Sequence, residues 1–152
     1  FLEWKKRVYP SAFIPYSFGD KVYGMPETQS FQVLYYRKDI FSELGLSVPN
    51  TWHQMKNTAA TLQSHNLQVG ISPDQTTLDM LLLQNGESYY NQNLSKIALT
   101  ESGAVSVFRD WTDLYTSYGV PLQYDAFNRF RTGEMPLVIA PLQLYNQLTV
   151  AA

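Results

Sequence analysis

The sequence contains no cysteine and only two histidines, and its charges nearly balance. Without cysteine there can be no disulfide scaffold and no thiolate metal site. His53 and His65 lie twelve residues apart, which does not place them on one face of a helix, so we predict no metal site and no cofactor. Eleven Lys and Arg residues against 13 Asp and Glu residues provide no excess of positive charge for phosphate backbones. Nucleic acid is therefore not an expected partner.

Long apolar runs and the common catalytic motifs are absent as well. No stretch has 18 uninterrupted apolar residues, and no basic start leads into a short apolar segment, so neither a membrane span nor a signal peptide is expected within this sequence. The patterns of serine hydrolases, zinc proteases and P-loop proteins do not occur. We predict no catalytic residue and no enzymatic activity.

What the sequence does contain is typical of a folded domain. Apolar residues make up 45% of the chain and charged residues 16%, which is enough apolar surface to form a core. A length of 152 residues suits a single domain, which we predict for residues 1–152. Because the sequence starts at Phe1 instead of a methionine and stops on an apolar run, we expect it to be a segment of a longer protein.

Strand and helix signals alternate along the chain. The Gly19-Asp20 step predicts a hairpin between Phe13–Ser17 and Val22–Met25. Further buried strands are predicted at 31–36, 67–72 and 136–140. Helices are predicted at 40–44, 52–65, 78–84, 102–118, 126–132 and 142–148, with Asp39, Thr51, Thr76 or Thr77, and Asp125 as caps. This order indicates an α/β fold with a mixed central sheet and helices on both faces.

Four segments, in order, resemble one protein family. They are residues 19–28 continuing into 34–41, residues 44–52 with the pattern Gly-Leu then Pro-Asn-Thr-Trp, residues 85–90, and residues 127–134 leading into 136–141. Each motif alone is weak, but their order is similar to that of the extracellular solute-binding proteins of ABC importers, of the maltose and oligosaccharide type. One departure is His53, which stands where the family usually has an acidic residue after the tryptophan.

The resemblance implies one lobe of a periplasmic-binding-protein type II fold, corresponding to most of the second lobe. It also implies a carbohydrate ligand and, through the full-length parent protein, the permease subunits of an ABC importer as partners. The expected location is extracellular, either anchored to the cell surface as a lipoprotein or periplasmic.

Candidate ligand residues follow from where the strands end. In open α/β sheets the ligand lies beyond the carboxyl ends of the strands, and sugar hydroxyls need both donors and acceptors. The candidates are Glu27, Thr28, Gln29 and Ser30 after the hairpin, Asp74 and Gln75 after the second buried strand, and Gln143 and Tyr145 after the third. For Tyr145 the resemblance implies an aromatic ring that stacks on a sugar.

Other interpretations of the same residues stay open at this stage. Glu27–Ser30 could be an ordinary polar turn, and Asp74 a helix cap. Asp74 and Glu27 could also be the carboxylate pair of a glycoside-active enzyme, which would need a separation of about 5 to 10 Å. A binding lobe for a non-sugar ligand, or a protein-interaction domain, is a further alternative.

Overall fold

A computed structural model describes residues 6–28 and 30–150, and the chain divides into two compact units, Phe1–Phe31 and Gln32–Ala152. The first unit contains the 3-10 helix η1 (Pro10–Tyr16) and a small hairpin of β1 (Ser17–Phe18) and β2 (Lys21–Val22). Gly19 takes a φ of 57°, which a tight turn between such strands requires. The predicted hairpin is thus confirmed.

The segment before the hairpin differs from the prediction. Residues 13–16 form the end of η1 instead of a strand. Pro10 starts this helix and Pro15 lies inside it, and a proline has no N–H to donate to a strand ladder. The hydroxyl of Ser17 donates to the carbonyl oxygen of Phe13 at 2.8 Å and closes the helix.

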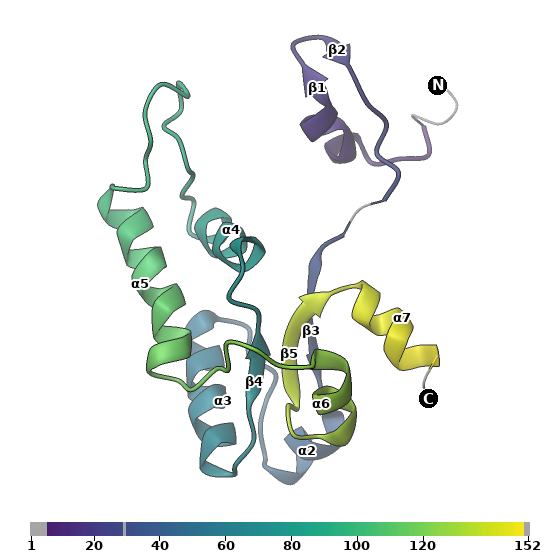
Figure 1. The fold of residues 1–152 in the computed structure, drawn as a ribbon, viewed down its shortest axis with the longest axis vertical. Coiled ribbons are helices and arrows are strands. Elements are labelled where there is room, and N and C mark those ends of the chain that lie inside the picture. Colours follow the sequence, from purple (N-terminus) through teal and green to yellow (C-terminus); the bar gives the residue numbers. More distant parts are fainter. Residues whose placement is uncertain (1–5, 29, 151–152) are drawn as a thin grey trace. The chain divides into compact units, whose positions relative to one another are not determined.

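The second unit is built on a three-stranded sheet in the order β3-β5-β4 (Figure 1). The strands are β3 (Gln32–Tyr36), β4 (Val69–Ile71) and β5 (Leu137–Pro141). β5 lies in the centre, antiparallel to β3 and parallel to β4. The three predicted strands of this unit are confirmed, and the sheet is mixed as expected.

Helices cover both faces of this sheet. Alternate residues of β5 point to opposite sides, so Leu137 and Ile139 join one buried cluster while Val138 and Ala140 join another. The first cluster contains residues of α2, α3 and α5, and the second contains residues of α6 and α7. The helices are α2 (Lys38–Glu43), α3 (Trp52–Ser64), α4 (Gln75–Gln84), α5 (Ser102–Thr116), α6 (Ala126–Thr132) and α7 (Gln143–Val150).

Two of the predicted helix caps are confirmed. The Thr51 hydroxyl accepts from the Gln54 amide at 3.2 Å, and the Gln54 side chain reaches back to the Asn50 amide at 2.7 Å. At α6, Asp125 accepts from the Asn128 amide at 3.0 Å, and Gly133 ends the helix with a φ of 86°. These local patterns fix where α3 and α6 begin.

Two other caps were predicted at the wrong residue. Helix α4 begins earlier than expected because Asp74 caps it, and Thr77, one of the two predicted caps, donates its backbone N–H to that carboxylate at 3.1 Å. Helix α2 also begins earlier, so Asp39 lies within its first turn. There its carboxylate pairs with the Arg37 guanidinium at 2.6 Å instead of capping.

The Arg37–Asp39 pair allows a direct test by pH titration. The hydrogen bond from Arg37 lowers the pKa of Asp39 from 3.8 to about 2. Because the folded-state pKa is lowered, the pair's contribution to stability is present above pH 3.8 and is lost as the pH falls toward 2. We expect carbon-detected NMR to place the Asp39 titration near 2, and the Arg37→Gln variant to return it toward 3.8. An unchanged midpoint in the variant would rule out the pair in solution.

Candidate functional site

The carboxyl ends of β4 and β5 lie at the same edge of the sheet. The two strands are parallel neighbours, and Ile71 pairs with Ile139. The chain therefore leaves β4 toward Asp74 and Gln75, and leaves β5 toward Gln143, on one side of the second unit. Two of the three predicted groups of ligand residues thus start from a common edge.

Asp74 is held rigidly at this edge. One carboxylate oxygen accepts from the Thr77 amide at 3.1 Å and the other from the Ser72 hydroxyl at 2.9 Å. The carbonyl oxygen of Ser72 in turn accepts from the Tyr115 hydroxyl at 3.0 Å. Asp74 is therefore a helix cap, and any contact with a ligand would add to that role.

A tyrosine that the sequence analysis did not single out lies beside these residues. The Tyr124 ring lies against Gly70 of β4, since a Cβ at residue 70 would come within 3.0 Å of Tyr124 Cε2. Burial raises the pKa of Tyr124, and the nearby Asp74 carboxylate raises it further. Burial likewise raises the pKa of Tyr115 to about 12. Both hydroxyls therefore stay protonated at neutral pH and can donate as well as accept.

Tyr124 also lines a hollow at the end of β5. The hollow has a volume of about 670 Å³ and lies between the N-terminal ends of α6 and α7. It is lined by Tyr124, Asp125, Ala126, Phe127, Ala140, Pro141, Gln143, Leu144 and Gln147. We call Asp74, Gln75, Tyr124, Asp125 and Gln143 the carboxyl rim, because all five follow the carboxyl ends of β4 and β5 or line this hollow.

The two α7 candidates differ in position. Gln143 is exposed and lines the hollow, whereas Tyr145 is 55% exposed and is not among the lining residues. Gln147, one helical turn after Gln143, joins it in the lining. A stacking role for Tyr145 stays a prediction, and Gln143 is the better placed of the two.

Gln75 lines a different hollow, of about 480 Å³, with Ser88, Tyr89, Tyr90 and Leu94. The Tyr89 hydroxyl donates to Asp79, and this bond is the main reason that the pKa of Tyr89 is raised. Gln75 thus shares this second hollow with two tyrosines, whereas Tyr124 lines the first.

The remaining candidates belong to the first unit. Glu27, Thr28 and Ser30 are exposed, and Gln29 lies outside the described residues. Their participation in a site with the carboxyl rim stays a prediction.

Sequence reasoning overlooked several residues at this edge. Tyr124, Phe127 and Gln147 were not singled out because the contacts that bring them together join α6 to α7. The available signal was the predicted Asp125 cap, which places Tyr124 directly before the start of α6 and Phe127 in its first turn. Trp52 packs against two of the buried clusters and also lines a hollow of about 310 Å³, where its Nε1 donates to Gln84 at 2.7 Å.

The described part of the chain, residues 6–28 and 30–150, has neither a metal-binding cluster nor a membrane-length helix. Among those residues, no group of three or more His, Asp or Glu side chains could hold a metal ion. No helix in residues 6–28 and 30–150 is both long enough and apolar enough to cross a bilayer.

Comparison with known proteins identifies the family. The sequence profile of the bacterial extracellular solute-binding proteins matches residues 3–150. The chain belongs to this family. A binding protein of Brucella abortus is 25% identical over 162 residues, which cover 96% of this chain and 39% of that protein. The chain thus spans about two-fifths of the length of such relatives.

Solved structures of solute-binding proteins share the fold. An ABC substrate-binding protein of Listeria monocytogenes, in complex with cycloalternan, superposes with a TM-score of 0.74 at 23% identity, over 96% of this chain and 42% of that one. UgpB of Mycobacterium tuberculosis, in complex with glycerophosphocholine, gives a TM-score of 0.79 at 20% identity, over 97% of this chain and 41% of UgpB. The predicted fold, one lobe of a solute-binding protein, is confirmed.

Proposed function

We propose that this chain is part of the second lobe of a two-lobed solute-binding protein that captures a carbohydrate outside the cytoplasm for an ABC importer. The observation that carries this proposal is the composition of the α6–α7 hollow, where amide side chains stand beside two aromatic rings. A pyranose ring offers hydroxyls to donors and acceptors, and C–H faces to aromatic rings. Tyr124, Phe127, Gln143 and Gln147 supply both kinds of contact.

The hollow is open on one side, as half of a binding cleft should be. Solute-binding proteins of this type close two lobes around the ligand by a hinge motion. We propose that Gln143 and Tyr124 contact the ligand from this lobe and that Asp74 and Gln75 border the same cleft. The segment Glu27–Ser30, which precedes β3, remains a candidate for contact with the ligand.

The enzyme alternative gains little from these contacts. A glycoside hydrolase needs one carboxyl group ready to donate a proton to the leaving oxygen. Both oxygens of Asp74 already accept hydrogen bonds, from Thr77 and Ser72, and these bonds hold the carboxylate at the start of α4. Asp74 is thus better suited to hold a helix in place than to act as a general acid.

Calorimetry on the full-length protein that carries this chain tests the proposal. Its panel should contain maltose, maltotetraose and laminaribiose, with a free amino acid and a dipeptide as non-sugar controls. We expect saturable binding of at least one sugar, with the sugar recovered unchanged. Binding of the dipeptide alone, or hydrolysis of a glycoside, would contradict the proposal.

Gln143 provides the residue-level test. Replacing it by alanine removes one side-chain hydrogen bond to the sugar, which we expect to weaken binding about tenfold. Asn146→Ala is the matched control, because Asn146 is exposed on the same helix and does not line the hollow. The control should bind within about twofold of the wild type. Equal affinities for both variants would exclude Gln143 from the site.

A further inference from the structure

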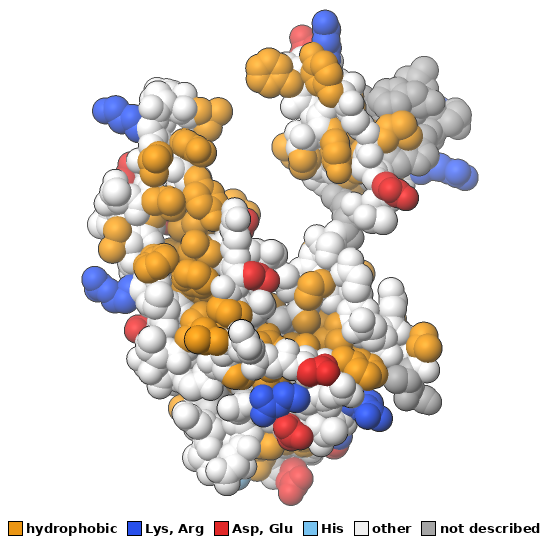
Figure 2. Space-filling model, in the orientation of Figure 1, with side chains coloured by type: hydrophobic (Ala, Val, Ile, Leu, Met, Phe, Trp, Pro, Cys, Tyr) orange, Lys and Arg blue, Asp and Glu red, His pale blue; other side chains and the backbone are white. Residues whose placement is uncertain are grey.

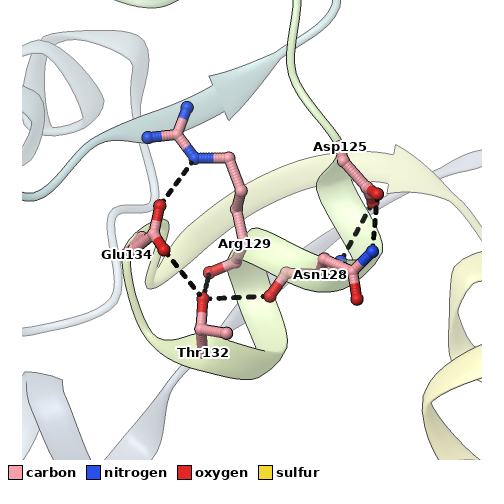
Figure 3. Close-up of polar contacts among 5 residues, drawn as sticks. All are labelled: Asp125, Asn128, Arg129, Thr132 and Glu134. Carbon is pink, nitrogen blue, oxygen red and sulfur yellow. Dashed lines mark hydrogen bonds and ion pairs between the residues drawn. The ribbon is translucent and has the colours of Figure 1, made fainter.

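Two helices start at the carboxyl rim, and each is capped there by a carboxylate. Asp74 accepts from the Thr77 amide at the start of α4 at 3.1 Å. Asp125 accepts from the Asn128 amide at 3.0 Å and from the Asn128 side chain at 2.6 Å (Figure 3). These bonds lower the pKa of Asp125, so it is ionised at neutral pH.

These caps change what the helix ends can bind. An uncapped helix N-terminus attracts anions through its N–H groups and a partial charge of about +0.5. Here both helix ends are already engaged by a full negative charge from the chain itself. Both carboxylates are exposed, and Asp125 also lines the α6–α7 hollow. The rim therefore presents negative charge to solvent.

Charged side chains are scattered over the face shown in Figure 2, and three of the seven basic residues of the second unit form ion pairs away from the carboxyl rim. Arg37 pairs with Asp39 and also donates to the carbonyl oxygens of Phe130 and Arg131. It follows the end of β3, which lies beside the start of β5 and therefore at the end of the sheet opposite the carboxyl rim. Arg129 pairs with Glu134 at the far end of α6 from Asp125 (Figure 3). Lys56 pairs with Asp110 of α5 at 2.6 Å.

Among the described residues, no lysine or arginine lines the α6–α7 hollow or the hollow beside Gln75. One basic side chain touches the lining, since Arg131 lies 5.8 Å from the centre of the Phe127 ring. It sits one turn further along α6, close to the end capped by Gly133. The polar side chains that line the α6–α7 hollow are thus carboxylate, amide and phenol groups.

We infer that the carboxyl rim selects an uncharged ligand and discriminates against phosphorylated or carboxylated forms of the same sugar. This inference rests on the proposed function and specifies the ligand class of the same site. A ligand anion would leave water for a surface that has two exposed carboxylates and no Lys or Arg among its lining residues, which is unfavourable. Neutral hydroxyls meet no such cost, because the amide and phenol groups can pair with them.

The test removes the rim charges and leaves the helix caps in place. Asparagine caps helices about as well as aspartate, so Asp74→Asn and Asp125→Asn should fold normally. In the full-length protein, calorimetry measures the affinity for a neutral disaccharide from the panel and for its uronic-acid form. For the wild type we expect the Kd of the uronic acid to be at least tenfold higher than the Kd of the neutral sugar. The double variant should lower this ratio of Kd values about fivefold.

Glu43→Gln is the matched control. It removes one negative charge from α2, which starts at the opposite edge of the sheet, and should leave the ratio of the two affinities unchanged. If the uronic acid binds the wild type as tightly as the neutral sugar, the inference is overturned while sugar binding stands. An equal ratio in the double variant and the Glu43→Gln control would also overturn it. If no sugar binds in either form, the proposed function fails, and the inference with it.

Discussion

Leu62→Ala should destabilise the second unit by about 3 kcal/mol. Leu62 is 0% exposed, and it belongs to the cluster that joins α3 to the sheet through Ile71 and Leu137. Truncation removes apolar contacts and leaves a cavity that the helix and sheet can fill only in part. Urea denaturation followed by circular dichroism measures the loss as a lower midpoint with an unchanged slope.

Gln63→Ala is the neighbouring control for this experiment. Gln63 is exposed on the same helix, so its truncation should change the free energy of unfolding by less than about 0.5 kcal/mol. Equal effects of the two substitutions would mean that α3 does not pack against the sheet through Leu62.

Gly70→Ala should destabilise the protein by about 1 to 3 kcal/mol although it adds a single methyl group. The added Cβ would lie 2.5 Å from the sulfur of Met135, 3.0 Å from the Tyr124 ring and 3.1 Å from Val138. Met135 and Val138 are fully buried, so neither can move without disturbing its cluster. Denaturation experiments give the stability loss, and we also expect weaker sugar binding because Tyr124 lines the hollow.

Gly103→Ala is a contrasting substitution of the same kind. The three atoms nearest to its Cβ would all belong to the carboxylate end of Glu87, which can rotate away. Because Gly103 lies within α5, alanine should be neutral or stabilise by up to about 1 kcal/mol. A stabilising Gly70→Ala would show that Tyr124 and Met135 do not pack over β4 as described.

Local sequence patterns predicted the elements of this fold well. Helix ends depend on residues that are close together in the sequence, so they can be predicted from it. Examples are the Thr51 and Asp125 caps and the glycines that follow α2, α4, α5 and α6. Errors arose at α2 and α4, where more than one residue near the helix start could cap it. Asp74, and not Thr76 or Thr77, caps α4, and the Ser72 hydroxyl holds its carboxylate in place. Helix-capping preferences of single residues do not include such a contact.

The candidate site was less predictable, because it depends on pairings between distant segments. The parallel pairing of β4 with β5 joins residues that are almost 70 positions apart, and it alone brings Asp74 and Gln143 to one edge. Tyr124 was missed for the same reason: the gap above Gly70 that it fills exists only once Met135 and β4 have met. The rule that ligands lie beyond the carboxyl ends of strands indicated the loops after β4 and β5, whereas the residues that line the hollow depend on how α6 and α7 pack.

β5 pairs with both other strands of the second unit and contributes to the clusters on both faces. A strand tied down in this way opens only when the whole unit unfolds. Gln143, two residues past its end, is therefore presented in a fixed position before any ligand arrives. Under the proposed function, binding of a ligand by Gln143 would therefore cost little conformational entropy. Adaptation to ligands of different shape would come from segments that are less firmly packed than β5.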